Sequence, residues 1–290
     1  MFVFKAAVVG AGVMGGEIAQ VIASADIPVV LKDVDQKFVD AGLEKARQVT
    51  EGQVAKLVKK GKATQEQADA QRDRVLSLIT GTTAYDEFGD VDFVIEAVPE
   101  KMEIKHAVFA ELDAATPGHA ILASNTSGLS ITEISDAVNR PDKVVGFHFF
   151  WPASYMRLIE VIEGDDTSPE TAQAAANFAQ AIKKMPVRCS EVPGFVVNRI
   201  LTSTAAEIWR YQDETGTPVE AIDEALAGSG AVPMGPFRLS DMSGLDTTLK
   251  VARDMQAAYG DRFYVHKGME ALVEQGNLGA KSGKGFYEHS

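Results

Sequence analysis

Apolar and polar positions follow two periods in turn along the first two thirds of the chain. Short apolar runs of strand length lie at residues 6–9, 28–31, 91–98 and 120–123, and apolar residues recur at helical spacing between them. Continuous apolar runs are typical of strands covered on both faces. Strands that alternate with helices predict an α/β fold with a parallel, doubly wound sheet of the Rossmann type.

A long helical pattern interrupts this alternation after the second strand. Between residues 36 and 78 the apolar positions keep helical spacing and break at Gly61, which predicts an inserted helical hairpin. Its first arm ends in a basic cluster made of Lys56, Lys59, Lys60 and Lys62. These lysines could simply complement the dipole at a solvated helix end, or they could dock a phosphorylated handle of a substrate.

The alternation stops after a strand predicted at residues 186–189. We place a domain boundary near Glu191, so that residues 1–190 form the α/β domain and residues 191–290 a C-terminal, all-helical domain. An apolar all-helical domain often supports dimerisation, and a homodimer is expected. Helices are predicted over residues 195–211, 218–227, 240–259 and 263–275.

A glycine-rich turn joins the first strand to the first helix. In the sequence GAGVMG, Gly10 allows the tight turn, Gly12 lets the backbone approach a pyrophosphate, and Gly15 lets the helix pack closely on the strand. The helix N-terminus presents free N–H groups and a positive dipole end to the phosphates. The second strand ends in Asp33, about 20 residues downstream, where an acid meets the adenosine ribose. Together these features predict a dinucleotide site.

Asp33 also bears on the choice of cofactor. A carboxylate accepts hydrogen bonds from a ribose 2′-hydroxyl and repels a 2′-phosphate, so NAD is favoured over NADP. The neighbouring Lys32 would allow some use of NADPH. The alternative is that Asp33, with Asp35 beside it, only caps the next helix.

Polar residues follow the strand at 120–123. The sequence Ser124-Asn125-Thr126-Ser127-Gly128 lies at the carboxyl end of a buried strand, where ligands bind in sheets of this type. These residues could equally form a turn and cap the helix predicted over residues 131–138.

His148 and Glu160 form the most informative pair of titratable residues. If the chain reverses around Ser154, the segments that carry them pair antiparallel and the two side chains face each other. A carboxylate inside a buried strand is costly without a partner. Bonded to one imidazole nitrogen, it would fix the tautomer and raise the basicity of the other nitrogen, as a base for alcohol oxidation requires. The pair could instead only join two strands.

Composition narrows the class of protein. The 290 residues are 46% hydrophobic and carry a net charge of −13, which argues against binding to nucleic acid or to anionic membranes. Cys189 is the single cysteine, so neither an internal disulfide nor a thiolate zinc site is expected, and no metal is predicted. Without a signal sequence or an apolar span, we expect a cytoplasmic enzyme.

Asn198 is a further candidate, in the second domain. It lies one turn into the long helix that follows Pro193-Gly194. It is either a buried polar anchor or a substrate contact.

Several motifs in order resemble the L-3-hydroxyacyl-CoA dehydrogenase family across nearly the whole chain. They are GAGVMG at residues 10–15, SNTS at 124–127, HFF at 148–150, EVI at 160–162, PGFVVNR at 193–199 and GKGFY at 283–287. The helical hairpin is also similar to that family. The resemblance implies NAD-dependent oxidation of (S)-3-hydroxyacyl-CoA in fatty-acid β-oxidation or short-chain acyl-CoA metabolism. It implies His148 as the base with Glu160 as its partner, and Ser127 and Asn198 as substrate-binding residues. The cofactor residues it implies are Gly10, Gly12, Met14, Gly15, Asp33, Val98, Glu100, Lys105 and Trp151.

Trp151 departs from the family pattern, which usually has asparagine after His-Phe-Phe. The change removes an amide and adds bulk near cofactor and substrate, so the pocket is reshaped, the NAD contacts are rearranged, or activity is lost. The alternatives are therefore a dehydrogenase of a non-CoA hydroxy acid on the same fold and a non-catalytic NAD-binding protein. A hydrolase built from Ser127, His148 and Glu160 ranks last, because no GxSxG elbow surrounds the serine.

Overall fold

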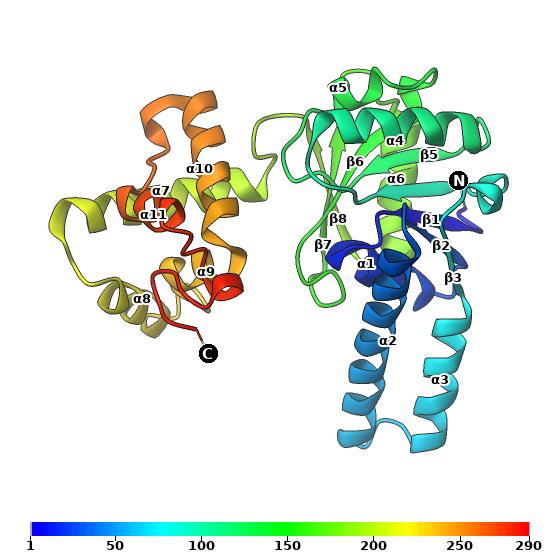
Figure 1. Ribbon diagram of the computed structural model, residues 1–290, viewed down its shortest axis with the longest axis horizontal. Helices are drawn as coiled ribbons and strands as arrows, with labels where there is room; N and C mark the ends of the chain where they lie inside the picture. Colours follow the sequence, from blue (N-terminus) through cyan, green and yellow to red (C-terminus); the bar gives the residue numbers. More distant parts are fainter. Residues whose placement is uncertain (1, 290) are drawn as a thin grey trace. The chain divides into compact units, whose positions relative to one another are not determined.

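The computed structural model describes residues 2–289, which divide into two compact units between Glu191 and Val192. The first unit is an α/β sandwich, drawn from blue to green in Figure 1, and the second is helical. No helix within residues 2–289 has both the length and the apolar character needed to cross a membrane.

The first unit is built on one sheet of eight strands, in the order β3-β2-β1-β4-β5-β6-β7-β8. Strands β1 to β6 are all parallel, β7 runs antiparallel to β6, and β8 runs parallel to β7. The order of the first six is that of the Rossmann fold, so the predicted fold class is confirmed. The strands are β1 (Ala6–Val9), β2 (Val29–Lys32), β3 (Ile79–Thr82), β4 (Phe93–Glu96), β5 (Ile121–Ser124), β6 (Val144–Phe149), β7 (Leu158–Glu163) and β8 (Met185–Ser190).

Helices cover both faces of this sheet. On one face, α1 (Val13–Ala23) and α6 (Pro169–Ala181) enclose the main apolar core with every second strand residue. The opposite face carries α4 (Met102–Ala115) and α5 (Ile131–Ser135). The contact between Lys105 of α4 and Glu96 of β4 shows that α4 lies on this face. Since side chains alternate along a strand, the buried polar strand residues of that second face point to the same side of the sheet. They are Lys32, Glu96, Ser124, His148 and Glu160.

The predicted helical insertion is present. Helices α2 (Gln36–Lys59) and α3 (Gln65–Ser77) run side by side away from the sheet (Figure 1). Asp35 caps α2 by accepting from the Lys37 N–H, and Thr64 begins α3 with a reciprocal capping box. Gly61 takes a positive φ of 65° between the two helices, where the sequence pattern breaks.

The second unit contains five α-helices among its described residues: α7 (Val197–Thr215), α8 (Val219–Gly228), α9 (Pro236–Ser243), α10 (Leu245–Tyr259) and α11 (Lys267–Glu274). The single helix predicted over residues 240–259 is wrong. Gly244, with φ of 92°, separates α9 from α10, and α9 already begins at Pro236. A proline in the first helical position and a glycine after the last one are the ordinary signals for such a break.

Two buried aspartates fix the C-terminal tail on this helical unit. Asp241 accepts from the backbone N–H groups of Phe286 and Tyr287 and lies 2.8 Å from the His289 ring. Asp223 accepts from the Tyr287 hydroxyl. The turn-rich tail therefore belongs to the folded unit.

Candidate active site

The glycine-rich loop has the backbone that its sequence predicts. Gly10 has a φ of 99°, and a Cβ on Gly15 would overlap the carbonyl oxygen of Gly10. At Gly12, by contrast, a Cβ would have no neighbour within 4 Å. Gly10 and Gly15 are thus required by the turn and by helix packing, while the open space at Gly12 fits close approach of a pyrophosphate. Met14 packs against the core behind the loop.

Asp33 is bound to the same loop. Its Oδ2 accepts from the Ala11 N–H at 2.7 Å, and its Oδ1 accepts from the Val34 N–H at 2.7 Å. The alternative in which Asp33 caps the next helix is wrong, because Asp35 performs that function. Lys32 is buried, with its ammonium 4.1 Å from the centre of the Tyr85 ring, so this cation is already paired.

The predicted pairing of His148 with Glu160 is present. The two residues face each other across the antiparallel β6–β7 ladder, and His148 Nδ1 lies 2.8 Å from Glu160 Oε2. Glu160 is completely buried, while His148 retains 7% of its exposure. The Phe150 ring packs against the imidazole with 4.5 Å between ring centres. A carboxylate in this position fixes the orientation and the tautomer of the imidazole.

The polar segment after β5 is held by Glu100. Glu100 Oε1 accepts from the Thr126 hydroxyl at 2.6 Å, from the Ser127 N–H at 2.8 Å and from the Ser127 hydroxyl at 3.2 Å. Burial alone would raise the pKa of Glu100, but the charge of Lys105 and these hydrogen bonds outweigh it and lower that pKa. Asn125 accepts from the Phe149 N–H, which ties this segment to the end of β6.

Lys105 and Glu96 form a buried ion pair that sequence reasoning missed. The Lys105 ammonium lies 2.8 and 2.9 Å from the two oxygens of Glu96 and 3.3 Å from Glu100. The Ser124 hydroxyl and the Val98 N–H complete the contacts of the Glu96 carboxylate. The signal was available in the sequence, since a carboxylate that ends a buried strand needs a partner.

Two predicted residues belong to other segments of the chain. Trp151 is the second residue of the loop between β6 and β7 and is 55% exposed. Asn198 lies in the first turn of α7, in the second unit.

Comparison with known proteins decides the family. The model of the 3-hydroxyacyl-CoA dehydrogenase NAD-binding domain matches residues 5–192, and that of the 3-hydroxyacyl-CoA dehydrogenase C-terminal domain matches residues 194–289. The chain belongs to the 3-hydroxyacyl-CoA dehydrogenase family. It is an NAD-dependent oxidoreductase of this family, as the resemblance of its motifs implied.

Similar members of the family cover the whole chain. The 3-hydroxybutyryl-CoA dehydrogenase of Clostridioides difficile is 41% identical over 99% of both chains. The fatty acid oxidation complex subunit alpha of Shewanella amazonensis is 38% identical over 98% of this chain and 39% of its own length. Among solved structures, (S)-3-hydroxybutyryl-CoA dehydrogenase PaaH1 from Ralstonia eutropha has a TM-score of 0.91 at 34% identity, with both chains completely covered.

Proposed function

We propose that this dehydrogenase oxidises (S)-3-hydroxyacyl-CoA to 3-ketoacyl-CoA with His148 as the general base. The contact between His148 and the buried Glu160 is the observation that carries the proposal. With Nδ1 directed at Glu160, Nε2 of the imidazole receives the proton of the substrate hydroxyl. The resulting imidazolium is stabilised by the Glu160 carboxylate, so the pair becomes most favourable as the proton is transferred.

The glycine-rich loop and Asp33 fit an NAD molecule. The open space at Gly12 admits the pyrophosphate, and Asp33 accepts from the adenosine ribose. When bound, NAD takes up the hydride that leaves C3 of the substrate. We assign to its binding the residues that the family resemblance implies: Gly10, Gly12, Met14, Gly15, Asp33, Val98, Glu100, Lys105 and Trp151.

Lys105 and Glu100 are both assigned to NAD binding, and they also form an ion pair with each other. Lys105 is 1% exposed and already bound to two carboxylates, so we propose that it serves NAD binding by fixing Glu100 and the backbone after β4. Glu100 in turn fixes the Ser127 hydroxyl, which steadies the reacting substrate oxygen. We also assign Asn198 to substrate binding, because the family resemblance implies it.

The lysines at the end of α2 are suited to the phosphates of the CoA handle. Lys56 and Lys59 are exposed in the last turn of the helix. The ammonium of Lys56 also contacts Tyr155, which belongs to the loop that follows His148. This contact connects the basic cluster to the segment beside the proposed base.

The test follows NADH absorbance with acetoacetyl-CoA and with the free hydroxy acid 3-hydroxybutyrate. The wild-type enzyme is expected to reduce the thioester with NADH, and His148→Gln to lose about three orders of magnitude in kcat while it still binds NAD. A His148→Gln enzyme with normal turnover would reject His148 as the base. Oxidation of free 3-hydroxybutyrate without activity on thioesters would favour a non-CoA hydroxy acid dehydrogenase.

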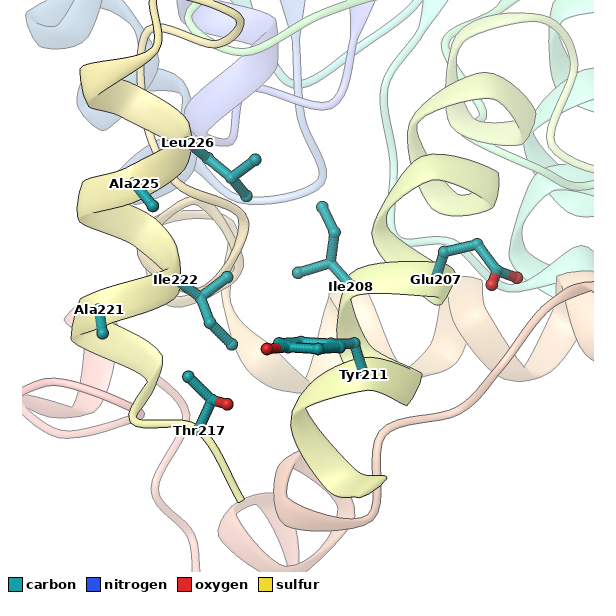
Figure 2. Close-up of a pocket in the computed structure, with 8 residues that line it drawn as sticks. All are labelled: Glu207, Ile208, Tyr211, Thr217, Ala221, Ile222, Ala225 and Leu226. Atoms are coloured by element: carbon teal, nitrogen blue, oxygen red, sulfur yellow. The ribbon is translucent and has the colours of Figure 1, made fainter. Parts of the chain in front are cut away.

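The helical unit supports assembly of two copies. Figure 2 shows apolar side chains of α7 and α8 that face each other across an open groove of about 410 Å³, among them Ile208, Tyr211, Ile222 and Leu226. Ile200 and Leu201 are exposed on the same helix α7, so the apolar surface continues beyond the groove. We assign this surface to a homodimer in the cytoplasm. Light scattering should give twice the chain mass, and Tyr211→Glu should shift it toward the monomer.

A further inference from the structure

Two buried charges in the first unit have no part in the proposed chemistry. Glu17, in α1, is 2% exposed, and Lys184, just before β8, is 8% exposed. Burial lowers the pKa of Lys184, although the charge of Glu17 opposes the effect. Buried charges of this kind are a poor source of stability, but they can hold a segment in one defined position.

Both charges act on the loop of residues 150–157, which joins β6 to β7. Glu17 Oε2 accepts from the Ser154 N–H at 3.1 Å and from the Ser154 hydroxyl at 3.0 Å. The Lys184 ammonium donates to the carbonyl oxygens of Ala153 and Met156 at 2.5 and 2.7 Å. The loop therefore has the Ser154 N–H held by Glu17 and two of its carbonyl groups held by Lys184.

The loop is also connected to the helical insertion, once directly and once through Glu17. Lys45 of α2 forms an ion pair with Glu17 at 3.2 Å, and Lys56 of the same helix contacts Tyr155. Glu17 thus links three segments: the helix that begins at the glycine-rich loop, the insertion with its basic cluster, and the loop after His148.

We propose that Glu17 is a positioning residue for the dehydrogenase reaction. By holding Ser154, it fixes the 150–157 loop on the helix whose first turn carries the glycine-rich motif, and thereby fixes the end of β6 that bears His148. The proposal rests on the proposed function of His148 as base. A polar contact that sets position can change turnover strongly, because misplacement of a reacting group by about 1 Å can cost about a hundredfold in rate.

The two tryptophans offer a direct measure of loop order. Trp151 lies in the loop and is 55% exposed, whereas Trp209 is 2% exposed in the helical core, so acrylamide quenches Trp151 selectively. Glu17→Ala is expected to raise the quenching constant roughly twofold, because an unfixed loop is more mobile. It should also lower kcat about tenfold or more. Glu17→Gln retains an oxygen that accepts from Ser154 and should restore both values.

Controls separate a positioning function from a structural one. Glu44→Ala removes an exposed carboxylate of α2 and should change neither quenching nor kcat. If Glu17→Ala lowers only the melting temperature and leaves kcat and quenching at wild-type values, the proposal is wrong. It is equally wrong if Glu17→Gln is as impaired as Glu17→Ala. Failure of the proposed function would be seen separately, as normal turnover of His148→Gln with unchanged quenching.

Discussion

The substitution Glu160→Gln tests the base most directly, because it removes one charge and keeps the volume of the side chain. Glu160 is completely buried, and His148 Nδ1 lies 2.8 Å from its Oε2. A glutamine oxygen can still accept from the imidazole, so the ring keeps its place in the β6–β7 ladder. The variant should therefore fold, whereas an alanine at this position would leave the imidazole without its buried partner.

The magnitude follows from the charge that develops on the imidazole. Once His148 has taken the substrate proton, its positive charge lies beside the Glu160 carboxylate. Unit charges about 4 Å apart interact by about 4 kcal/mol at an effective dielectric constant of about 20. Since each 1.4 kcal/mol corresponds to a factor of about ten in rate, Glu160→Gln should lower kcat about a thousandfold.

The assay compares kcat for oxidation of (S)-3-hydroxybutyryl-CoA by NAD with the dissociation constant for NADH measured by fluorescence. Glu163→Gln is the matched control, because it makes the same change on the same strand at a partly exposed residue paired with Arg188. We expect the control to keep wild-type kcat and both variants to keep NADH affinity. A Glu160→Gln enzyme within threefold of the wild-type kcat would refute the reasoning about the pair.

Three further predictions concern the cofactor, the CoA handle and acid stability. Asp33→Ser should raise the KM for NAD about tenfold and reduce the preference for NAD over NADP, because a charged hydrogen-bond acceptor is lost. If the ratio of kcat/KM for NAD to kcat/KM for NADP is the same in the variant and the wild type, the reasoning is contradicted. Exchanging Lys56 and Lys59 for glutamate should raise the KM for acetoacetyl-CoA about tenfold with the KM for NADH unchanged, whereas Lys62→Glu, beyond the helix end, should have a smaller effect. The pKa of Glu100 is lowered although burial alone would raise it, so its ionised form stabilises the fold above its ordinary pKa, and this contribution disappears as the pH falls. The free energy of urea unfolding should therefore decrease more steeply on acidification in the wild type than in Glu100→Gln; parallel curves would exclude this contribution.

Local sequence signals were sufficient for most of the fold. Much of the sheet was predictable because buried strands such as β1 are continuous apolar runs, and the turn at Gly10 because its conformation requires glycine. The facing positions of His148 and Glu160 followed from their equal distance to the chain reversal, which fixes the register of an antiparallel pair. Each of these inferences depends only on residues that are close in the sequence or that belong to a single hairpin.

Contacts between distant segments were not predictable in the same way. Lys105 and Glu96 belong to a helix and a strand, and their pairing depends on which face of the sheet the helix covers. In the sequence, Glu17 is a polar residue in a mainly apolar helix. Its partner Ser154 lies 137 positions further along the chain. The break at Gly244 was missed because apolar spacing continues across it.

The backbone pairing of strand β6 constrains the position of His148. Strand β6 pairs with β5 over residues 144–146 and with β7 over residues 146–149, so His148 is held on the β7 side, and the Asn125 side chain accepts from the Phe149 N–H next to it. A large displacement of His148 would break the β6–β7 ladder, and the contact of Glu17 with Ser154 limits smaller shifts of the strand end, so the proposed base offers a fixed reference point for the substrate alcohol. A change in the accepted acyl length would then have to come from the surrounding segments, which can vary while the proposed proton acceptor keeps its place.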